Sequence, residues 1–190
     1  MKTNEPFQNG RWLVLVIALC AGCGQTAAVK EEPPSPTVTT NFERLPALLA
    51  GVQGGGAVSV HEGLPDAFWE PELRGEEMRR KKSTQYHGYP FYEETPTLQE
   101  NDVGQLTACL SAPSSFSRYS GPKNAGEYNA DYCISWKTSS GETQALVSLE
   151  CAEVKLYGPN SELHCDLSPP AAQQLKQLLE RYRKNRPPKE

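Results

Sequence analysis

The sequence predicts an α+β fold: an antiparallel β-meander with two or three packed helices, preceded by a signal peptide and a disordered tether. Short β-branched and aromatic runs, separated by turn residues, fill positions 132–167. Amphipathic helical patterns lie on both sides of that stretch. The length of 190 residues is typical of one domain, and the 16 prolines and 15 glycines indicate a modest core with unfolded ends.

The chain begins with a basic segment followed by a short apolar run. Lys2 and Arg11 precede an unbroken apolar stretch from Trp12 to Leu19, and small residues come next. A helix that crosses a bilayer needs ~20 apolar residues, so this run is too short to span one. The three parts together are those of a secretory signal, and we expect residues 1–22 to be removed on export.

The residues at the predicted cleavage site are Cys20, Ala21, Gly22 and Cys23. They resemble the lipobox of bacterial lipoproteins, in which a leucine usually stands at the place of Cys20 and a cysteine closes the motif. The resemblance implies lipidation of Cys23, by a thioether-linked diacylglycerol and an N-acyl chain such as palmitate. Several acyl chains give stable membrane anchoring. The residue after Cys23 is Gly24 and not an aspartate, which by the same resemblance implies sorting to the outer membrane in a host with two membranes.

The region after Cys23 has the composition of a linker. Residues 24–40 carry three prolines and no aromatic side chain, which is typical of disordered segments. We therefore expect a lipidated N-terminus and disordered linker over 23–40 and a single α+β domain over 41–185. The remaining residues, 186–190, are expected to form a flexible tail.

Two amphipathic helices and one weaker helix are expected. The C-terminal helix has Ser168 as its cap and Pro169 at its first position. Its apolar stripe consists of Leu175, Leu178, Leu179 and Tyr182. The second helix, over 101–112, has an apolar stripe of Val103, Leu106, Cys109 and Leu110. The third, over 70–82, is interrupted by Gly75, which lowers helix propensity.

The strands of the meander lie between the second helix and the C-terminal helix. Tyr132–Thr138 and Thr143–Leu149 are predicted to form a hairpin around the turn at 139–142. The second of these strands continues to Tyr157. Its apolar residues shift from odd to even positions near Ala152, which indicates a β-bulge within one strand.

Three further strands complete the expected sheet. A turn at 158–161 leads into the last strand, Leu163–Leu167. Earlier strands are expected at Ala57–His61 and Tyr86–Tyr92. The aromatic side chains of the latter are interpreted either as one buried strand face or as a recognition surface.

Export favours disulfide bonds among the remaining cysteines, which are Cys109, Cys133, Cys151 and Cys165. The predicted registers place Cys133 opposite Ser148 and Cys165 opposite Val154. Ser148 and Val154 are six residues apart on the predicted middle strand, so the two cysteines are held about 20 Å apart. A disulfide requires Cα atoms within ~7 Å, so these two cysteines are not expected to pair. Only Cys109, on a helix over the sheet, can then reach another cysteine. We expect one helix-to-sheet disulfide at most, with the other thiols buried in the core.

No catalytic, metal-binding or cofactor-binding motif is recognised. His61, His87 and His164 lack the paired spacing of a zinc site, and no nucleophile elbow or phosphate loop is present. The formal net charge of −4 disfavours nucleic acid as a partner. The basic run Arg79–Lys82 is interpreted as a solvated helix end, or as a contact for anionic lipid headgroups or an acidic partner.

These observations predict a lipid-anchored, exported envelope protein. Its domain is expected to bind an envelope protein partner or to serve a structural role, without enzymatic activity and without a cofactor. The alternative is an exported enzyme that uses a cysteine and a histidine, or a metal ion.

Overall fold

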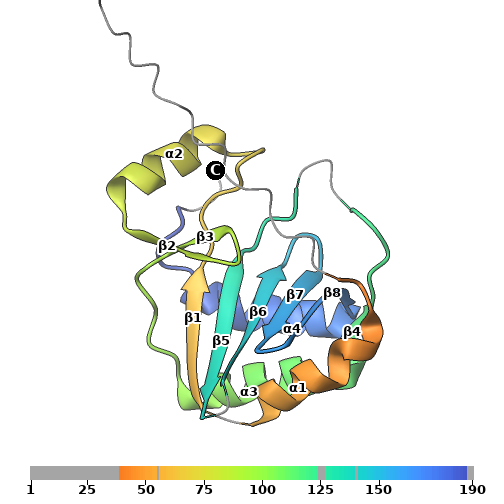
Figure 1. Cartoon of the computed structure of the whole chain (residues 1–190). Helices are drawn as coiled ribbons and strands as arrows, with labels where there is room; N and C mark the ends of the chain where they lie inside the picture. Colours follow the sequence, from red (N-terminus) through yellow and green to blue (C-terminus); the bar gives the residue numbers. More distant parts are fainter. Residues whose placement is uncertain (1–38, 55, 124–126, 140, 188–190) are drawn as a thin grey trace, which may run out of the picture. The chain divides into compact units, whose positions relative to one another are not determined.

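Six antiparallel strands form the central sheet, because their apolar side chains alternate and their ends carry turn residues. The computed structural model describes residues 39–54, 56–123, 127–139 and 141–187, all within one compact unit. The strand order is β1-β5-β6-β7-β8-β4. The bounds are Ala57–Glu62 (β1), Phe116–Arg118 (β4), Tyr132–Thr138 (β5), Gly141–Ser148 (β6), Glu153–Gly158 (β7) and Ser161–Leu167 (β8). The α+β meander predicted from the sequence is confirmed (Figure 1).

Three helices cover one face of this sheet (Figure 1). They are α1 (Leu45–Gln53), α3 (Glu100–Ser111) and α4 (Pro169–Leu179), the last continued by a 3-10 turn over Glu180–Tyr182. Their apolar stripes pack against alternate strand residues such as Ile134, Trp136 and Val147. The helices predicted over 101–112 and after Ser168 are therefore confirmed, whereas α1 was not predicted. No helix of the described ranges is both long and apolar enough to cross a membrane.

A two-stranded sheet covers part of the opposite face. Its strands are β2 (Ser83–Tyr86) and β3 (Tyr89–Tyr92), and Tyr89 and Phe91 pack there on Cys133 and Leu146. The single strand predicted over Tyr86–Tyr92 is therefore wrong. The chain reverses at His87 and Gly88, whose φ angles of 54° and 84° are those of a tight hairpin turn.

The aromatic residues of this hairpin are mostly buried. Tyr89, Phe91 and Tyr92 all belong to the buried set. Of the two interpretations of these aromatic residues, a buried strand face therefore fits better than a recognition surface. The Tyr92 hydroxyl donates a hydrogen bond of 2.8 Å to Glu77, which ties β3 to the helix α2 (Pro71–Arg80).

The parity shift near Ala152 reflects a tight turn and not a bulge. The predicted middle strand is in fact two strands, β6 and β7, which pair with each other from Gln144↔Tyr157 to Ser148↔Glu153. Ala152 has a φ of 50°, a left-handed conformation that reverses the chain. The turn contains Leu149, Glu150, Cys151 and Ala152, so it lacks the glycine, proline or asparagine that usually reveals a turn in a sequence.

The two outer hairpins differ in how well their registers were predicted. Val154 pairs with Cys165, as predicted for the turn at 158–161. Cys133 pairs with Leu146 and not with Ser148, because the β5–β6 connection is two residues shorter than expected and β6 begins at Gly141. The short edge strand β4 was not predicted.

Candidate functional site

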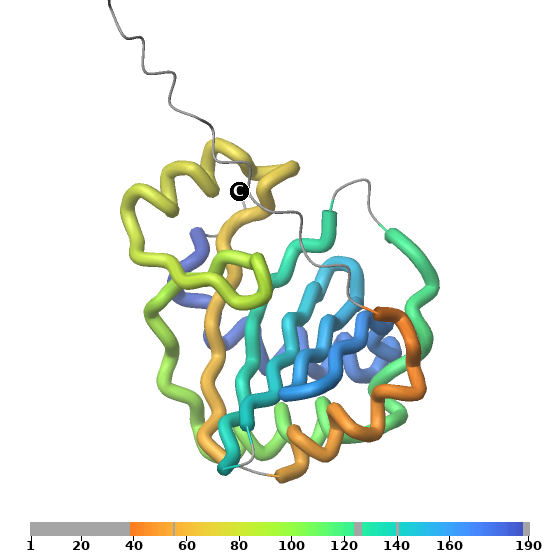
Figure 2. Tube along the Cα trace, viewed as in Figure 1, coloured from red at the N-terminus to blue at the C-terminus, as the bar shows by residue number. Residues whose placement is uncertain are grey.

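Four segments meet at one end of the sheet. Glu62 pairs with Tyr132, Tyr132 with Val147, and Ser148 with Glu153. The loop after β1, the segment before β5 and the β6–β7 turn therefore lie at the same end of the sheet. Residues 183–187, here called the strap, join them after α4, and Figure 2 shows this segment beside the end of β1.

The carboxylate of Glu62 holds the backbone of the strap. It accepts hydrogen bonds from the backbone N–H groups of Lys184 at 3.0 Å, Asn185 at 2.6 Å and Arg186 at 3.3 Å. Glu62 is only 2% exposed. Three donors directed at one buried carboxylate fix the path of the strap, because each bond compensates the desolvation of the charge.

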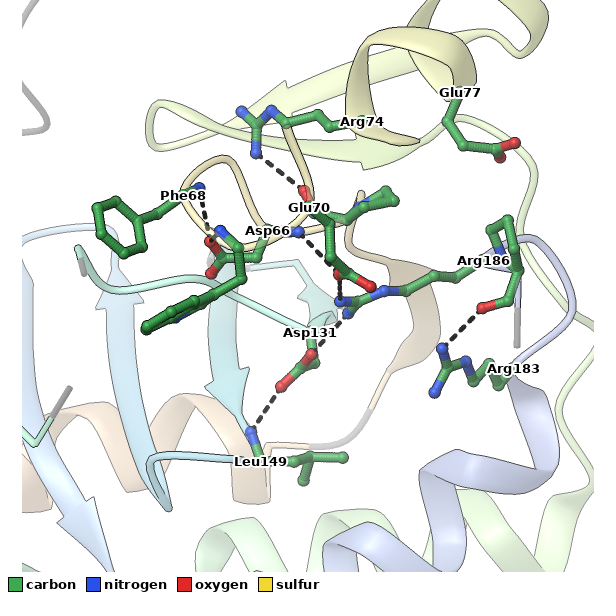
Figure 3. Close-up of polar contacts among 12 residues, drawn as sticks. Asp66, Phe68, Glu70, Arg74, Glu77, Asp131, Leu149, Arg183 and Arg186 are labelled. Carbon is green, nitrogen blue, oxygen red and sulfur yellow. Dashed lines mark hydrogen bonds and ion pairs between the residues drawn. The ribbon is translucent and has the colours of Figure 1, made fainter. Parts of the chain in front are cut away.

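The Arg186 guanidinium lies between two carboxylates (Figure 3). Its Nη2 is 2.7 Å from Glu70 Oε2, and its Nη1 is 2.9 Å from Asp131 Oδ1. The side chain is 8% exposed. Burial alone lowers the pKa of Arg186, but the bonds to Glu70 and Asp131 outweigh it and raise the pKa above its ordinary value. The guanidinium therefore links the loop after β1 to the start of β5.

The position of Arg186 corrects the domain boundary expected from the sequence. The tail predicted over 186–190 includes this residue, yet its side chain is among the better-buried charged groups at the site. The two prolines that follow gave the segment the composition of a tail. The partners Glu62, Glu70 and Asp131 lie far away in the sequence, so no local pattern indicated them.

Both carboxylates of this arrangement are themselves positioned. The Asp131 Oδ2 accepts a hydrogen bond of 2.8 Å from the Leu149 backbone in the β6–β7 turn. The Glu70 Oε2 accepts one of 3.3 Å from the Asp66 backbone (Figure 3). Each carboxylate is thus directed at Arg186 by a second contact, which reduces the conformational freedom of the site.

An exposed aromatic pair borders the site. Asp66 Oδ1 accepts the backbone N–H groups of Phe68 at 2.7 Å and Trp69 at 3.0 Å, so the turn is fixed by its first residue. Phe68 and Trp69 are each 60% exposed, and their rings meet edge to face with centroids 4.8 Å apart. With Met78, they are the large hydrophobic side chains that stay exposed within the described ranges.

These elements surround a cleft of about 460 Å³. Its lining comprises Asp66, Trp69, Glu70, Glu127, Asn129, Asp131, Ser148, Glu150, Cys151 and Arg186. Five acidic residues and one arginine therefore line the cleft, and the guanidinium of that arginine is paired with two of the carboxylates. The cleft is strongly anionic, and a tryptophan ring at its border can add a cation–π contact.

A second group of titratable side chains crosses the other face of the sheet. Register places His61, Cys133, Leu146, Lys155 and His164 in one cross-strand row. Lys155 donates a hydrogen bond to the Tyr89 hydroxyl at 2.5 Å, and its ammonium is 4.4 Å from the Tyr128 ring centroid. Burial lowers the pKa of Lys155. The two tyrosines thus stabilise a buried amine.

The three histidines named in the sequence are held apart by separate contacts. His61 Nδ1 lies 3.1 Å from the Tyr92 carbonyl oxygen, and His87 stacks on Tyr157 with ring centroids 3.5 Å apart. His164 Nε2 lies 2.9 Å from Glu153 Oε2. Within the described ranges, no three histidine, cysteine or acidic side chains are grouped so that they could hold a metal ion.

Cys109, Cys133, Cys151 and Cys165 are all free thiols, so none of them forms the single helix-to-sheet disulfide that the sequence allowed at most. The Cys109 Sγ faces the Ala171 carbonyl of α4 at 4.0 Å, so it packs between helices. Cys133 and Cys165 lie in the cores on opposite faces of the sheet, three strands and about 14 Å apart. The two cysteines are thus separated across the strands of the sheet, and not along a single middle strand as predicted. Cys23 lies outside the described residues.

Burial keeps the cysteine thiols protonated at neutral pH. It raises the pKa of Cys133 and of Cys165 to about 12, and it also raises the pKa values of Cys109 and Cys151. A nucleophilic cysteine requires the opposite shift. Cys109, Cys133 and Cys165 have the packing role expected of core thiols, whereas Cys151 is half-buried in the β6–β7 turn and lines the cleft.

The basic run Arg79–Lys82 ends α2. Lys81 forms an ion pair of 2.9 Å with Glu77, and the other three side chains are exposed. Lys81 and Lys82 also line a cavity together with Glu93 and Glu94, which offset part of their charge. The run has the character of a solvated helix end.

Comparison with known proteins returns no match: no protein-family model, curated protein or solved structure is significantly similar to this chain. The functional assignment therefore depends on the site itself.

Proposed function

We propose that this protein is a lipid-anchored component of a bacterial envelope whose domain binds a positively charged segment of a partner protein. The anionic cleft carries this proposal, because five acidic residues and one arginine line it beside Trp69. Lipid on Cys23 would hold the domain at the membrane, the outer one in a host with two membranes. Residues 23–40 would act as its linker.

The lining favours an organic cation over an inorganic one. Guanidinium and ammonium groups form charge-assisted hydrogen bonds with carboxylates and also stack on aromatic faces. Phe68 and Trp69 provide exposed apolar surface at the border of the cleft, which a peptide side chain can cover and a bare ion cannot. A segment of a partner protein rich in lysine or arginine combines both properties.

The environments of the cysteines and histidines favour binding over catalysis. Burial raises the pKa values of the four thiols, so they are poor nucleophiles at neutral pH. Each histidine is engaged by a different neighbour on the sheet face away from the helices. The enzymatic alternative would require such groups to converge in a cavity.

Neutralising the cleft is expected to weaken binding of a cationic probe. In the full chain purified in detergent, Glu127→Gln with Glu150→Gln removes two exposed cleft charges and keeps side-chain size. We expect the Kd for a fluorescent hexa-lysine peptide, measured by anisotropy at low salt, to rise about tenfold.

The matched control is Glu43→Gln with Glu100→Gln, which makes the same change in net charge at exposed positions outside the cleft. The control should leave the Kd within about twofold of the unmodified chain, because screened charges away from the cleft contribute little. An equal loss in both double variants would show that the peptide senses only net charge, and would contradict binding in the cleft.

Cys23→Ser is expected to abolish lipid attachment, because only a thiol can form the thioether. Cells given a radioactive or alkynyl fatty acid should label the unmodified protein and not the variant. Cys20→Ser serves as the control and should keep its label. A labelled Cys23→Ser protein would contradict the assignment of the anchor.

A further inference from the structure

We infer that Glu70 and Asp131 form a clamp for a guanidinium group, that Arg186 occupies this clamp in the unbound protein, and that an arginine side chain of the partner displaces it. This inference rests on the proposed function, which it makes specific for arginine and supplies with a means of regulation.

The clamp matches the shape of a guanidinium. Two carboxylates from separate segments each accept from a different terminal nitrogen of Arg186, at 2.7 and 2.9 Å. A planar group with nitrogens at its corners can bridge acceptors on two sides at once. The compact ammonium of lysine lacks this fixed geometry, so a lysine should fit the clamp less well. Arg186 thus displays the chemistry that Glu70 and Asp131 recognise.

The fit of Arg186 in the clamp is incomplete. Its Nε is buried and finds no hydrogen-bond acceptor in the part of the chain that the structure describes, and the same is true of Arg183 Nε in the strap. A buried donor without an acceptor loses the hydrogen bond that it makes with water. Both arginines would regain that bond if the strap were displaced, which lowers the cost of displacement.

Arg186 also lies where a ligand would enter. Its side chain lines the anionic cleft and a neighbouring cavity of about 320 Å³ bordered by Lys176, Glu180 and Arg183. Asp131 and Glu150 line both cavities as well. A guanidinium that enters from the cleft therefore meets the same carboxylates. The exchange replaces one cation by another, so that neither carboxylate is left buried without a partner.

Removing the internal guanidinium should strengthen binding of an external one. The full chain in detergent is compared with Arg186→Gln, using fluorescent hexa-arginine and hexa-lysine peptides. When a competing group blocks a site, the apparent affinity equals the intrinsic affinity multiplied by the fraction of time that the site is open. We expect Arg186→Gln to lower the Kd for hexa-arginine about tenfold and the Kd for hexa-lysine by a smaller factor.

Two further variants make the comparison specific. Arg183 lies in the same strap but donates to the Pro187 carbonyl oxygen, so Arg183→Gln should leave the Kd within about twofold of the unmodified chain. Adding Glu70→Gln to Arg186→Gln should cancel the gain for hexa-arginine, because the clamp then lacks one of its carboxylates.

Hydrogen exchange of the unmodified chain tests displacement even where a variant fails to fold. The amides of residues 184–186, which are bonded to Glu62, should lose protection when hexa-arginine is added. Unchanged protection of these amides at saturating peptide would overturn displacement of the strap.

The outcomes separate this inference from the proposed function. If the unmodified chain binds through Glu127 and Glu150, and Arg186→Gln binds equally or more weakly, the clamp is wrong and the cleft function stands. If Arg186→Gln binds hexa-arginine and the unmodified chain does not, the clamp is right and Arg186 closes the unmodified cleft to hexa-arginine. If neither protein binds either peptide, both proposals fail.

Discussion

Gly63→Ala is expected to destabilise the fold by about 3 kcal/mol and to separate the two carboxylates of the clamp, Glu70 and Asp131. A Cβ atom at this position would lie 1.9 Å from the Ala130 carbonyl oxygen and 3.0 Å from its carbon. Because these are backbone atoms, no side-chain rotation relieves the clash. Gly63 also donates a hydrogen bond of 2.7 Å to the Asp131 carbonyl oxygen. The loop after β1 can approach the start of β5 only through this glycine, and that approach brings Glu70 and Asp131 to the same guanidinium.

Gly75→Ala is the matched control, since a Cβ there would meet nothing within 4 Å. It lies inside α2, where alanine is favoured over glycine by up to about 1 kcal/mol. Urea unfolding of both variants measures the difference. Binding of hexa-arginine should be lost in Gly63→Ala and kept in Gly75→Ala. Equal stability of the two variants would mean that the close approach at Gly63 is not needed.

Leu178→Ala is expected to lower the free energy of unfolding by about 2–5 kcal/mol, as large-to-small changes in packed cores do. Leu178 lies on α4, is 2% exposed and belongs to the core between the helices and the sheet. Its removal leaves a cavity that the rigid sheet cannot close. The loss should appear as a lower urea midpoint with an unchanged slope.

Gln177→Ala tests the same helix one position earlier. Gln177 is exposed, so its replacement should change the stability by less than about 0.5 kcal/mol. A substantial loss in Gln177→Ala, or none in Leu178→Ala, would mean that the buried face of α4 is misassigned.

Where the sequence carried a strong local pattern, the predicted element is present. The stripes of α3 and α4 and the turn at 158–161 were all recognisable, because apolar spacing and turn residues act over a few positions. The β6–β7 turn was misread for a physical reason. The β6–β7 turn has no glycine or proline, and Ala152 takes its left-handed conformation only because the strands on both sides pair with each other. A local rule cannot foresee a conformation that tertiary pairing imposes.

The site could not be predicted in the same way. The four residues that define it, Glu62, Glu70, Asp131 and Arg186, come from segments that meet only in the folded sheet. The clearest sequence signal near the site is Asp66, because an aspartate shortly before Phe68, Trp69 and a proline indicates a turn that the aspartate side chain caps. That pattern predicts the turn but not the charge that surrounds it.

The wide spacing of these four residues also determines when the site can form during synthesis. A chain that emerges from its N-terminal side first has β1 and both clamp carboxylates available before Arg186 is made. The contacts of Arg186 with Glu70 and Glu62 span 116 and 124 residues, so they are among the last to form. The strap therefore closes over Glu70 and Asp131 only after the strands that bring these two carboxylates together have been made.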